Sequence, residues 1–297
     1  LYDLSSFKKY NVRSNIDTKV TKEFTVSLDL AGRYEKISES ALGDGLFSSI
    51  IGSKPTERAY VPTSVDPDGL GDNGLNTSPI GVTERVGYHK VENSVFQSTL
   101  KGVYEAPFLK GLKASASFSF DRWFSRDKTF QTPFEFYKYD RILDKYNKTK
   151  SGGGINLYEG RAEDQRLTYQ ASLMYDNSFL DQHNVSALFV LEESSYKYNV
   201  LSAARVNFIS PEIEEIFAGP TLDLTNGGSS SETVRRGYVG RLNYNYEGKY
   251  LFQFNFRYDG SFNFPDGKRW GFFPSVSAGW RISEEKFMEP TKHIINN

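Results

Sequence analysis

Few side chains of this chain have the types and spacing that catalysis requires. The 297 residues contain no cysteine, which excludes thiol nucleophiles, disulfides and cysteine-held metals. The three histidines, His89, His183 and His293, are scattered, and none belongs to a Ser-His-Asp arrangement or a His-x-x-x-His pair. Gly152–Gly154 could suggest a phosphate-binding loop, but no strand, glycine-rich turn and helix follow in the order that such a loop needs. The sequence therefore predicts a turn there, no enzymatic activity and no cofactor.

One acidic segment carries ligands that a hard cation prefers. Asp66, Asp68 and Asp72 lie close together in the sequence, and carboxylate oxygens are the usual ligands of Ca²⁺. The segment lacks the spacing of an EF-hand loop and its closing glutamate. The favoured interpretation is a turn-rich surface loop without metal, and a calcium site is the alternative.

Aromatic side chains are the stronger candidates for contacts with a ligand. They make up 15% of the chain, with 23 Phe and 19 Tyr. Sugar rings and apolar peptide side chains both stack on exposed aromatic faces, while polar neighbours fix their orientation. The substrate-binding candidates at one expected rim are Trp123, Phe136, Tyr137 and Tyr139, with Phe124 and Phe134 beside them. For each of them, an aromatic belt at a membrane–water interface or packing within a loop is the alternative.

The elements that must position these residues are β-strands, because apolar and polar residues alternate along most of the chain. In Gly240–Gly260 the even-numbered positions from Leu242 to Tyr258 are almost all aromatic and the odd-numbered ones almost all polar. Nine strands are predicted, near Tyr10–Val20, Phe24–Tyr34, Val91–Tyr104, Leu112–Phe124, Glu163–Asn177, Asn184–Tyr198, Val234–Tyr246, Tyr250–Asp259 and Pro274–Ser283.

The connections between these strands alternate between short and long. The short ones are 21–23, 105–111, 178–183 and 247–249, and the longer ones are 35–90, 125–162, 199–233 and 260–273. In an up-and-down sheet this pattern places tight turns at one rim and large loops at the other. Loops of this length without structure of their own are uncommon in compact domains and are usually functional.

Strand length favours a membrane barrel over a soluble sheet. The predicted strands have about 11–15 residues, whereas ~5–6 is usual and ~9–11 suffice for a tilted strand to cross a bilayer. Short turns, long loops and apolar/polar alternation are together typical of outer-membrane barrels. The predicted fold is an all-β, antiparallel up-and-down transmembrane β-barrel segment that is not closed. The alternative is a soluble β-sandwich with its apolar faces buried between two sheets.

Charge and hydropathy exclude two other classes. Lys and Arg total 36 against 37 Asp and Glu, which argues against nucleic acid as a partner. No apolar run approaches the ~18 residues of a membrane helix. No secretory signal opens the chain at Leu1, so we expect a mature protein or a piece of one.

Two long blocks carry a family resemblance. GYVGRLNYNYEGKYLFQFNFRYDGS and RWGFFPSVSAGWRISEEKFM resemble the SusC-type, RagA-like TonB-dependent transporters of the Bacteroidetes outer membrane. Upstream, YEAPFLKGL at Tyr104–Leu112 is similar to a connector of that family. The residues that match the family's motifs, and for which the resemblance implies a structural role, are Arg257, Asp259, Gly260, Ser261, Trp270, Gly271, Pro274, Ser275, Trp280 and Arg281.

The resemblance implies a barrel of about 22 strands with a plugged lumen in the outer membrane. In that family a plug domain contacts TonB, a SusD-like surface lipoprotein caps the barrel, and the pair imports glycans or oligopeptides. Residues 1–297 would then be part of the barrel domain, in contact with outer-membrane lipid, with the plug and the remaining strands absent. The turn 247–249 would be periplasmic, and Asp259 would begin an outward loop. A surface binding module or adhesin, and more weakly a passive porin, are the alternatives.

Overall fold

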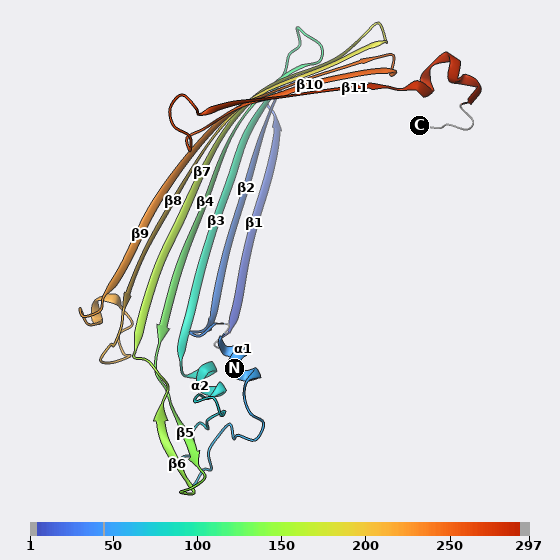
Figure 1. The fold of residues 1–297 in the computed structure, drawn as a ribbon. Helices are drawn as coiled ribbons and strands as arrows, with labels where there is room; N and C mark the ends of the chain where they lie inside the picture. The colour runs from blue at the N-terminus through green and yellow to red at the C-terminus, as the bar shows by residue number, and fades with distance from the viewer. Residues whose placement is uncertain (1–4, 44, 292–297) are drawn as a thin grey trace.

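A single antiparallel sheet of nine strands makes up most of the molecule (Figure 1). The structure is a computed structural model that describes residues 5–43 and 45–291. The strands of the sheet are β1 (Ser6–Lys19), β2 (Phe24–Ser40), β3 (Gly87–Glu105), β4 (Leu112–Gln131), β7 (Asn156–Phe179), β8 (His183–Arg205), β9 (Thr225–Tyr246), β10 (Tyr250–Ser261) and β11 (Trp270–Trp280). They lie in sequence order, interrupted only by a small hairpin of β5 (Glu135–Asp140) and β6 (Lys145–Lys150). The predicted up-and-down sheet is confirmed.

The strands begin and end near their predicted positions at the tight turns but run further at the opposite rim. β7 has 24 residues and starts at Asn156, whereas the prediction starts at Glu163. β8 continues to Arg205, beyond the predicted end at Tyr198. The prediction stopped early because apolar and polar residues cease to alternate there, although backbone pairing continues with both kinds mixed on each face.

β11 is displaced from its predicted range. It runs over Trp270–Trp280 with Pro274 inside the strand, and Ile282 belongs to a short 3₁₀ turn. The apolar alternation of Val276 and Trp280 is therefore correct, but its extension to Ile282 is wrong. The chain leaves the ladder at Arg281, whose N–H donates to the Lys249 carbonyl at 2.7 Å.

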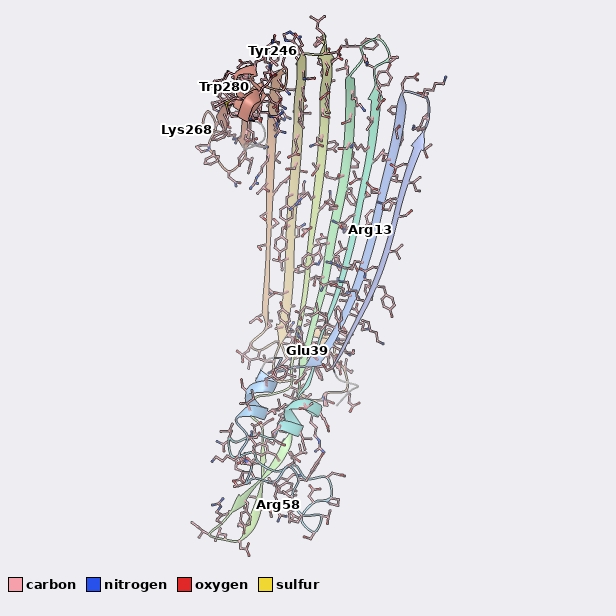
Figure 2. The ribbon with its side chains drawn as sticks, turned by 90° about the vertical axis from the view of Figure 1, so that its right-hand side faces the viewer. Arg13, Glu39, Arg58, Tyr246, Lys268 and Trp280 are labelled. Atoms are coloured by element: carbon pink, nitrogen blue, oxygen red, sulfur yellow. The ribbon has the colours of Figure 1, made fainter. Side chains whose placement is uncertain are left out.

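Tight turns occupy one rim of the sheet and loops the other, as Figure 1 shows with the turns at its top and most of the loops at its bottom. In Figure 2, Tyr246 and Trp280 lie near the turn rim, and Glu39 and Arg58 lie toward the loop rim. Gly111, in the β3–β4 turn, has a φ of +91°, and a Cβ there would lie 2.0 Å from the Asp176 carbonyl oxygen. Only glycine fits such a turn, which is how the chain reverses in so few residues.

The two faces of the sheet differ in polarity, because direct cross-strand partners share a face. Register places Leu28 opposite Leu100, Leu100 opposite Phe118, and Phe254 between Leu242 and Val276. We call the large apolar residues of this face the apolar band: Val26, Leu28, Leu30, Leu100, Phe118, Phe120, Leu167, Leu173, Val185, Phe189, Leu191, Leu242, Phe252, Phe254, Phe256, Phe272 and Val276. The opposite, polar face carries Arg241, Asn243, Asn245, Gln253 and Asn255 over the same strands.

The buried core lies in the loops rather than on the sheet. One cluster joins loop 41–86 to loop 132–155 through Leu70, Val82, Val86, Phe134 and Phe136. We call this packed pair of loops, which includes the β5–β6 hairpin, the loop unit. A second cluster of Phe130, Leu157 and Phe208 holds loop 206–224 against the strand ends.

The described helices are short. They are α1 (Gly45–Ile51), α2 (Pro79–Glu84) and three 3₁₀ segments at Ile216–Ala218, Ile282–Glu284 and Lys286–Thr291. Within the described part of the chain, no helix has the length and apolarity to cross a membrane.

Candidate functional site: a membrane wall and its polar lining

Aromatic rings mark both ends of the apolar band on β9, β10 and β11. At the turn rim, Tyr246 stacks on Tyr250 with ring centroids 6.2 Å apart, and Trp280 pairs with Tyr250 across β10 and β11. At the other end, Trp270 stacks on Tyr258 at 4.8 Å. Tyrosine and tryptophan gather in this way at the two interfaces of a membrane, where their rings meet lipid and their polar atoms meet water.

The distance between the two aromatic girdles fits a membrane. Tyr250 and Tyr258 are eight positions apart on β10. The strand therefore rises about 27 Å between them at ~3.4 Å per residue, or about 20 Å along the membrane normal at a tilt of ~40°. Outer-membrane barrels carry an apolar band about 25 Å tall between aromatic girdles. Phe252, Phe254 and Phe256 fill the space between the girdles.

Two glycines let aromatic rings lie flat across neighbouring strands. A Cβ on Gly240 would lie 2.0 Å from the Phe256 ring, and one on Gly260 would lie 2.9 Å from the Trp270 ring. The rings thus cover backbone that would otherwise face the apolar surroundings, a packing arrangement known from β-sheets with glycine in their strands.

Beyond the apolar band, toward the loop rim, the same face becomes charged. Four cross-strand ion pairs lie there: Lys36–Glu92 and Lys128–Glu159 at 3.2 Å, Arg122–Glu163 at 2.9 Å, and Lys197–Glu232 at 3.2 Å. A fifth pair on this face, Glu193–Arg236, lies level in register with Tyr169 at the edge of the band. Each of these exposed pairs adds only about 0–1 kcal/mol to stability. Their position is more informative than their energy, because charged side chains are disfavoured among lipid tails. The face is therefore apolar near the turn rim and hydrophilic toward the loop rim.

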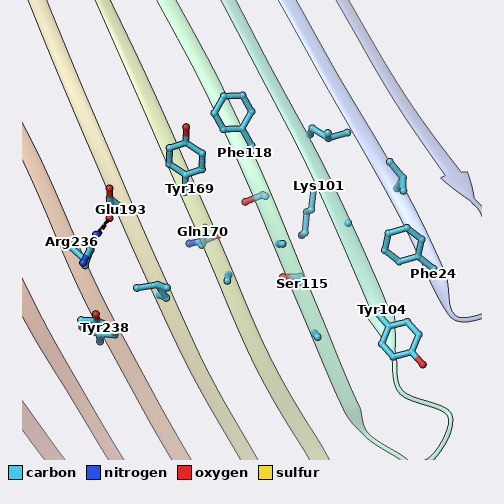
Figure 3. A pocket seen from close by; sticks show the side chains of 18 residues that line it. Phe24, Lys101, Tyr104, Ser115, Phe118, Tyr169, Gln170, Glu193, Arg236 and Tyr238 are labelled. Carbon is cyan, nitrogen blue, oxygen red and sulfur yellow. Dashed lines mark hydrogen bonds and ion pairs between the residues drawn. The ribbon is translucent and has the colours of Figure 1, made fainter.

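A shallow groove of about 1020 Å³ crosses the apolar face (Figure 3). Its floor is made of small residues, Gly102, Ala114, Ala116 and Ala171, and its walls include Phe24, Tyr104, Phe118 and Tyr169. Phe118 and Tyr169 touch with ring centroids 5.0 Å apart. The Glu193–Arg236 pair lies at one side of the groove (Figure 3). The groove is a hollow in the apolar surface without converging polar groups, so it has no features of a reaction centre.

The polar face carries a patch of aromatic and charged residues closer to the loop rim than the apolar band. Trp123 lies opposite Asp164 and Val95 in register, within β4, inside its predicted strand range but further from the strand's end than expected. The neighbouring Tyr196 donates its hydroxyl to Asp164 at 3.4 Å, and the Arg166 guanidinium lies 5.4 Å from the Tyr196 ring centroid. Flat rings beside charged groups can hold either sugars or peptide side chains. Tyr196 on β8 and Arg166 on β7 were not predicted, because each lies close to the predicted end of its strand.

The other predicted aromatic residues lie in the loop unit and differ in accessibility. Phe136 is only 1% exposed and belongs to the loop core, so it offers no face to a ligand in this conformation. Tyr137 donates a hydrogen bond to Asp66 at 2.9 Å, which raises the pKa of Tyr137 and lowers that of Asp66. Tyr139 is 45% exposed and packs against Tyr146 near the hairpin tip. Of the four candidates, Tyr139 is thus the exposed one, Trp123 and Tyr137 are half-buried, and Phe136 is buried.

Two of the three aspartates considered for calcium accept hydrogen bonds from backbone or side-chain donors through their carboxylates. Asp66 accepts the Asp68 N–H at 3.1 Å in addition to the Tyr137 hydroxyl, and Asp72 accepts the Thr77 N–H at 3.1 Å. Across residues 5–43 and 45–291, no group of three or more acidic, histidine or cysteine side chains is arranged to hold a metal ion. The carboxylates therefore organise the turns of the loop unit.

Comparison with known proteins finds receptors to which this sheet is similar. No family model matches the chain. TonB-dependent receptor P3 of Formosa agariphila is 26% identical over 305 residues, which is 98% of this chain and 28% of that protein. TonB-dependent receptor SusC of Bacteroides thetaiotaomicron is 52% identical over 52 residues, 18% of this chain and 5% of that protein.

The fold has a matching counterpart among solved structures. The RagAB peptide transporter superposes with a TM-score of 0.69 at 19% identity, over 96% of this chain and 31% of the matched chain. The chain corresponds to a barrel segment of a SusC-type TonB-dependent receptor. It spans 26–28% of the length of the three curated receptors that it matches over nearly its whole length.

In this SusC-type segment the motif residues gather around the rim ends of β10 and β11. Arg257 donates two hydrogen bonds to Asp259, both at 3.0 Å, and Ser261 N–H donates to the Arg269 carbonyl at 3.0 Å. Cross-strand register aligns Asp259 with Gly271, Gly260 with Trp270, Phe256 with Pro274 and Asn255 with Ser275. Trp280 and Tyr250 both donate to Glu285 at the turn rim, at 3.1 and 2.6 Å. The structural role that the resemblance implies for these residues stays a prediction.

One histidine of the SusC-type segment lies in an ionic cluster that sequence reasoning missed. On the polar face at the loop rim, His89 Nδ1 lies 2.8 Å from Glu39 Oε1, and Nε2 lies 3.2 Å from Asp127 Oδ2. Both ring nitrogens can donate only when the imidazole is protonated. Of the other histidines, His183 contacts the Tyr244 hydroxyl at 2.7 Å, and His293 lies outside the described residues.

The His89 cluster gives a pH-dependent prediction. Burial lowers the pKa of His89, but its hydrogen bonds to Glu39 and Asp127 outweigh burial and raise the pKa above the usual value. A raised folded-state pKa gives stability that is complete below the unfolded pKa of about 6.5 and is lost as pH rises through the folded pKa. We therefore expect the β2–β3–β4 rim to open more readily as pH rises through this range, measured by pulse proteolysis of the full-length protein. His89→Gln should remove this pH dependence, and an identical pH profile in both proteins would contradict the assignment.

Proposed function

We propose that this segment forms part of the wall of an outer-membrane TonB-dependent transporter that imports glycans or oligopeptides. One observation carries the proposal: a face with an apolar band, bounded by aromatic girdles and then by ion pairs, opposite a polar face. Such a sheet fits a wall with lipid on one side and a hydrated lumen on the other. The role is binding and passage, with no covalent bond made or broken.

The proposal fixes an orientation. The tight turns face the periplasm and the loop unit faces the cell exterior, since outer-membrane barrels have short periplasmic turns and long outer loops. β8 continues for 14 residues beyond Leu191, to Arg205, so the wall would extend well beyond the membrane before the loops begin. The loop unit is then the part of this segment that meets a SusD-like surface lipoprotein. TonB would act through a plug domain elsewhere in the full-length protein, and the remaining strands would close the barrel.

The substrate class stays open between glycan and peptide. The RagAB structure is described as that of a peptide transporter. The likeness in fold therefore supports a peptide as the substrate. Trp123, with Tyr196, Asp164 and Arg166 beside it, is the part of the polar face best suited to hold either substrate. Tyr139 offers a second aromatic surface at the loop rim.

The alternative is a soluble or surface-attached β-rich binding module or adhesin, in which the loops bind and nothing is transported. Such a module must cover its apolar face, yet residues such as Val276 and Phe272 remain exposed in the described structure.

Fractionation of cells that express the full-length protein separates the two functions. We expect the protein in the outer-membrane fraction, extracted only by detergent, and we expect its deletion to abolish uptake of a labelled peptide or glycan mixture. Recovery in the aqueous fraction without detergent would reject the transporter.

A further inference from the structure

A second pocket lies on the polar face, under the connection between β10 and β11, where the ends of these two strands meet the middle of β8 and β9. β10 has only 12 residues against 22 in β9, so Ser261 at its end pairs with Arg235 part-way along β9. Loop 262–269 therefore closes over the sheet at that level instead of at the distant loop rim. The resulting cavity has a volume of about 700 Å³, within the usual size range of ligand sites.

The charges that line this pocket leave cations in excess. Arg257 is held by Asp259 through two hydrogen bonds of 3.0 Å, and Arg269 pairs with Asp266 at 2.9 Å. Arg235 and Lys268 also line the cavity, and neither side chain has a partner among the described residues.

One further carboxylate lines the pocket. Glu192 accepts a hydrogen bond from the neutral Gln170 amide at 3.2 Å. Two unpaired cations, Arg235 and Lys268, therefore face one carboxylate, and the pocket keeps a net positive charge.

Apolar rings complete the pocket. Phe264 and Phe273 are both more than half exposed, and each lines the cavity. Phe273 lies opposite Arg257 in register, on the polar face. A ligand with a flat or apolar part beside a negative group could therefore contact a ring and a cation together.

The motif residues and the unpaired cations contribute different features to this pocket. Arg257, Asp259, Gly260, Ser261 and Gly271 belong to the matched motif, and they build the wall. Arg235 and Lys268, which leave the positive charge in excess, lie outside the motif residues.

We propose that this pocket binds an anionic group, a carboxylate or a sulfate, of the ligand that the protein imports. This proposal rests on the transport function proposed above. It narrows the substrate class, because such a pocket would select acidic substrates over neutral ones. Arg235 and Lys268 supply the charge, and Phe264 and Phe273 contact the body of the ligand. The anion can belong to an acidic oligosaccharide or to an acidic peptide, and the probes below separate these sources.

The test is titration calorimetry on the full-length protein in detergent with four probes: a galacturonic acid trimer, the matching galactose trimer, triglutamate and triglutamine. We expect one of the two acidic probes to bind at least about tenfold more tightly than its neutral match. A hydrogen bond to a charged group is worth at least about a factor of ten in affinity. Arg235→Gln and Lys268→Gln should each remove most of that preference and leave the binding of neutral probes unchanged.

The matched control is Lys197→Gln, which removes one positive charge from the opposite face of the same sheet. It should preserve the preference for the acidic probe. The proposal is overturned if neither acidic probe binds more tightly than its neutral match, or if the preference survives the double variant R235Q/K268Q. Either result would leave the transport function standing as long as the protein fractionates with the outer membrane.

Discussion

Phe254→Arg is expected to destabilise the membrane-inserted barrel by about 2–4 kcal/mol, the cost of an arginine on the lipid face at the bilayer midplane. Phe254 lies midway between Tyr250 and Tyr258 on β10, with Leu242 and Val276 as its cross-strand neighbours. A guanidinium at this depth must lose hydration or draw water into the bilayer. The measurement is a urea titration of the full-length protein folded into lipid vesicles.

Gln253→Arg is the matched control, since it places the same charge one residue away on the polar face. Its cross-strand neighbours, Asn243 and Ser277, are neutral and polar. We expect a change below about 1 kcal/mol, because this side of the strand faces a hydrated lumen. Equal costs at positions 253 and 254, or a larger cost at 253, would show that the apolar band does not face lipid.

Phe136→Ala is expected to cost about 3–5 kcal/mol of local stability in the loop unit, the usual penalty for emptying a buried phenylalanine site. Phe136 is in the core that joins the two loops, beside Phe134 and Leu70. The same core is crossed by hydrogen bonds from Tyr137 N–H to the Leu70 carbonyl at 2.7 Å and from Asp72 N–H to the Tyr137 carbonyl at 2.9 Å. Losing the ring should therefore release the β5–β6 hairpin from loop 41–86.

Amide hydrogen exchange measures this release directly. The Tyr137 amide should exchange at least about a hundredfold faster in the variant, since about 1.4 kcal/mol corresponds to a factor of ten. Amides in the middle of β4 should keep their protection, because the sheet does not depend on this core. Tyr139→Ala, at a half-exposed position on the same hairpin, should change exchange little. Unchanged protection of Tyr137 in the Phe136 variant would mean that the two loops are not coupled.

The sheet was predictable from the sequence where one physical constraint acts at every second residue. Within the apolar band one face meets apolar surroundings and the other meets water, so residues such as Phe252 and Gln253 must alternate. Beyond the band each face mixes apolar and polar residues, the alternation disappears, and the sequence no longer marks the strand. The predicted ends at Glu163 and Tyr198 therefore fall close to this change of surroundings rather than at the ends of the strands.

The candidate site was predictable only in part, for a related reason. The family motif located the rim of β10 and β11, but Phe136 was taken for an exposed loop residue because nothing local reveals that another loop covers it. The cluster around His89 joins residues 50 and 38 positions apart in the sequence. Register counted back from the tight turn at Gly111 would have brought His89 and Asp127 close together, had the strands been extended to the rim.

The central claim, a wall that spans the outer membrane with its turns inside and its loops outside, is tested most directly by single-cysteine labelling. The 297 residues contain no cysteine, so one reporter at a time can be placed in the full-length protein after any cysteine elsewhere is replaced by serine. Ile142, 93% exposed in the loop unit, and Phe108, 79% exposed in the β3–β4 turn, are matched apolar surface positions at opposite rims. Ile142→Cys should react with a membrane-impermeant maleimide on intact cells, and Phe108→Cys only after the outer membrane is permeabilised. Labelling of Phe108→Cys on intact cells would contradict the account.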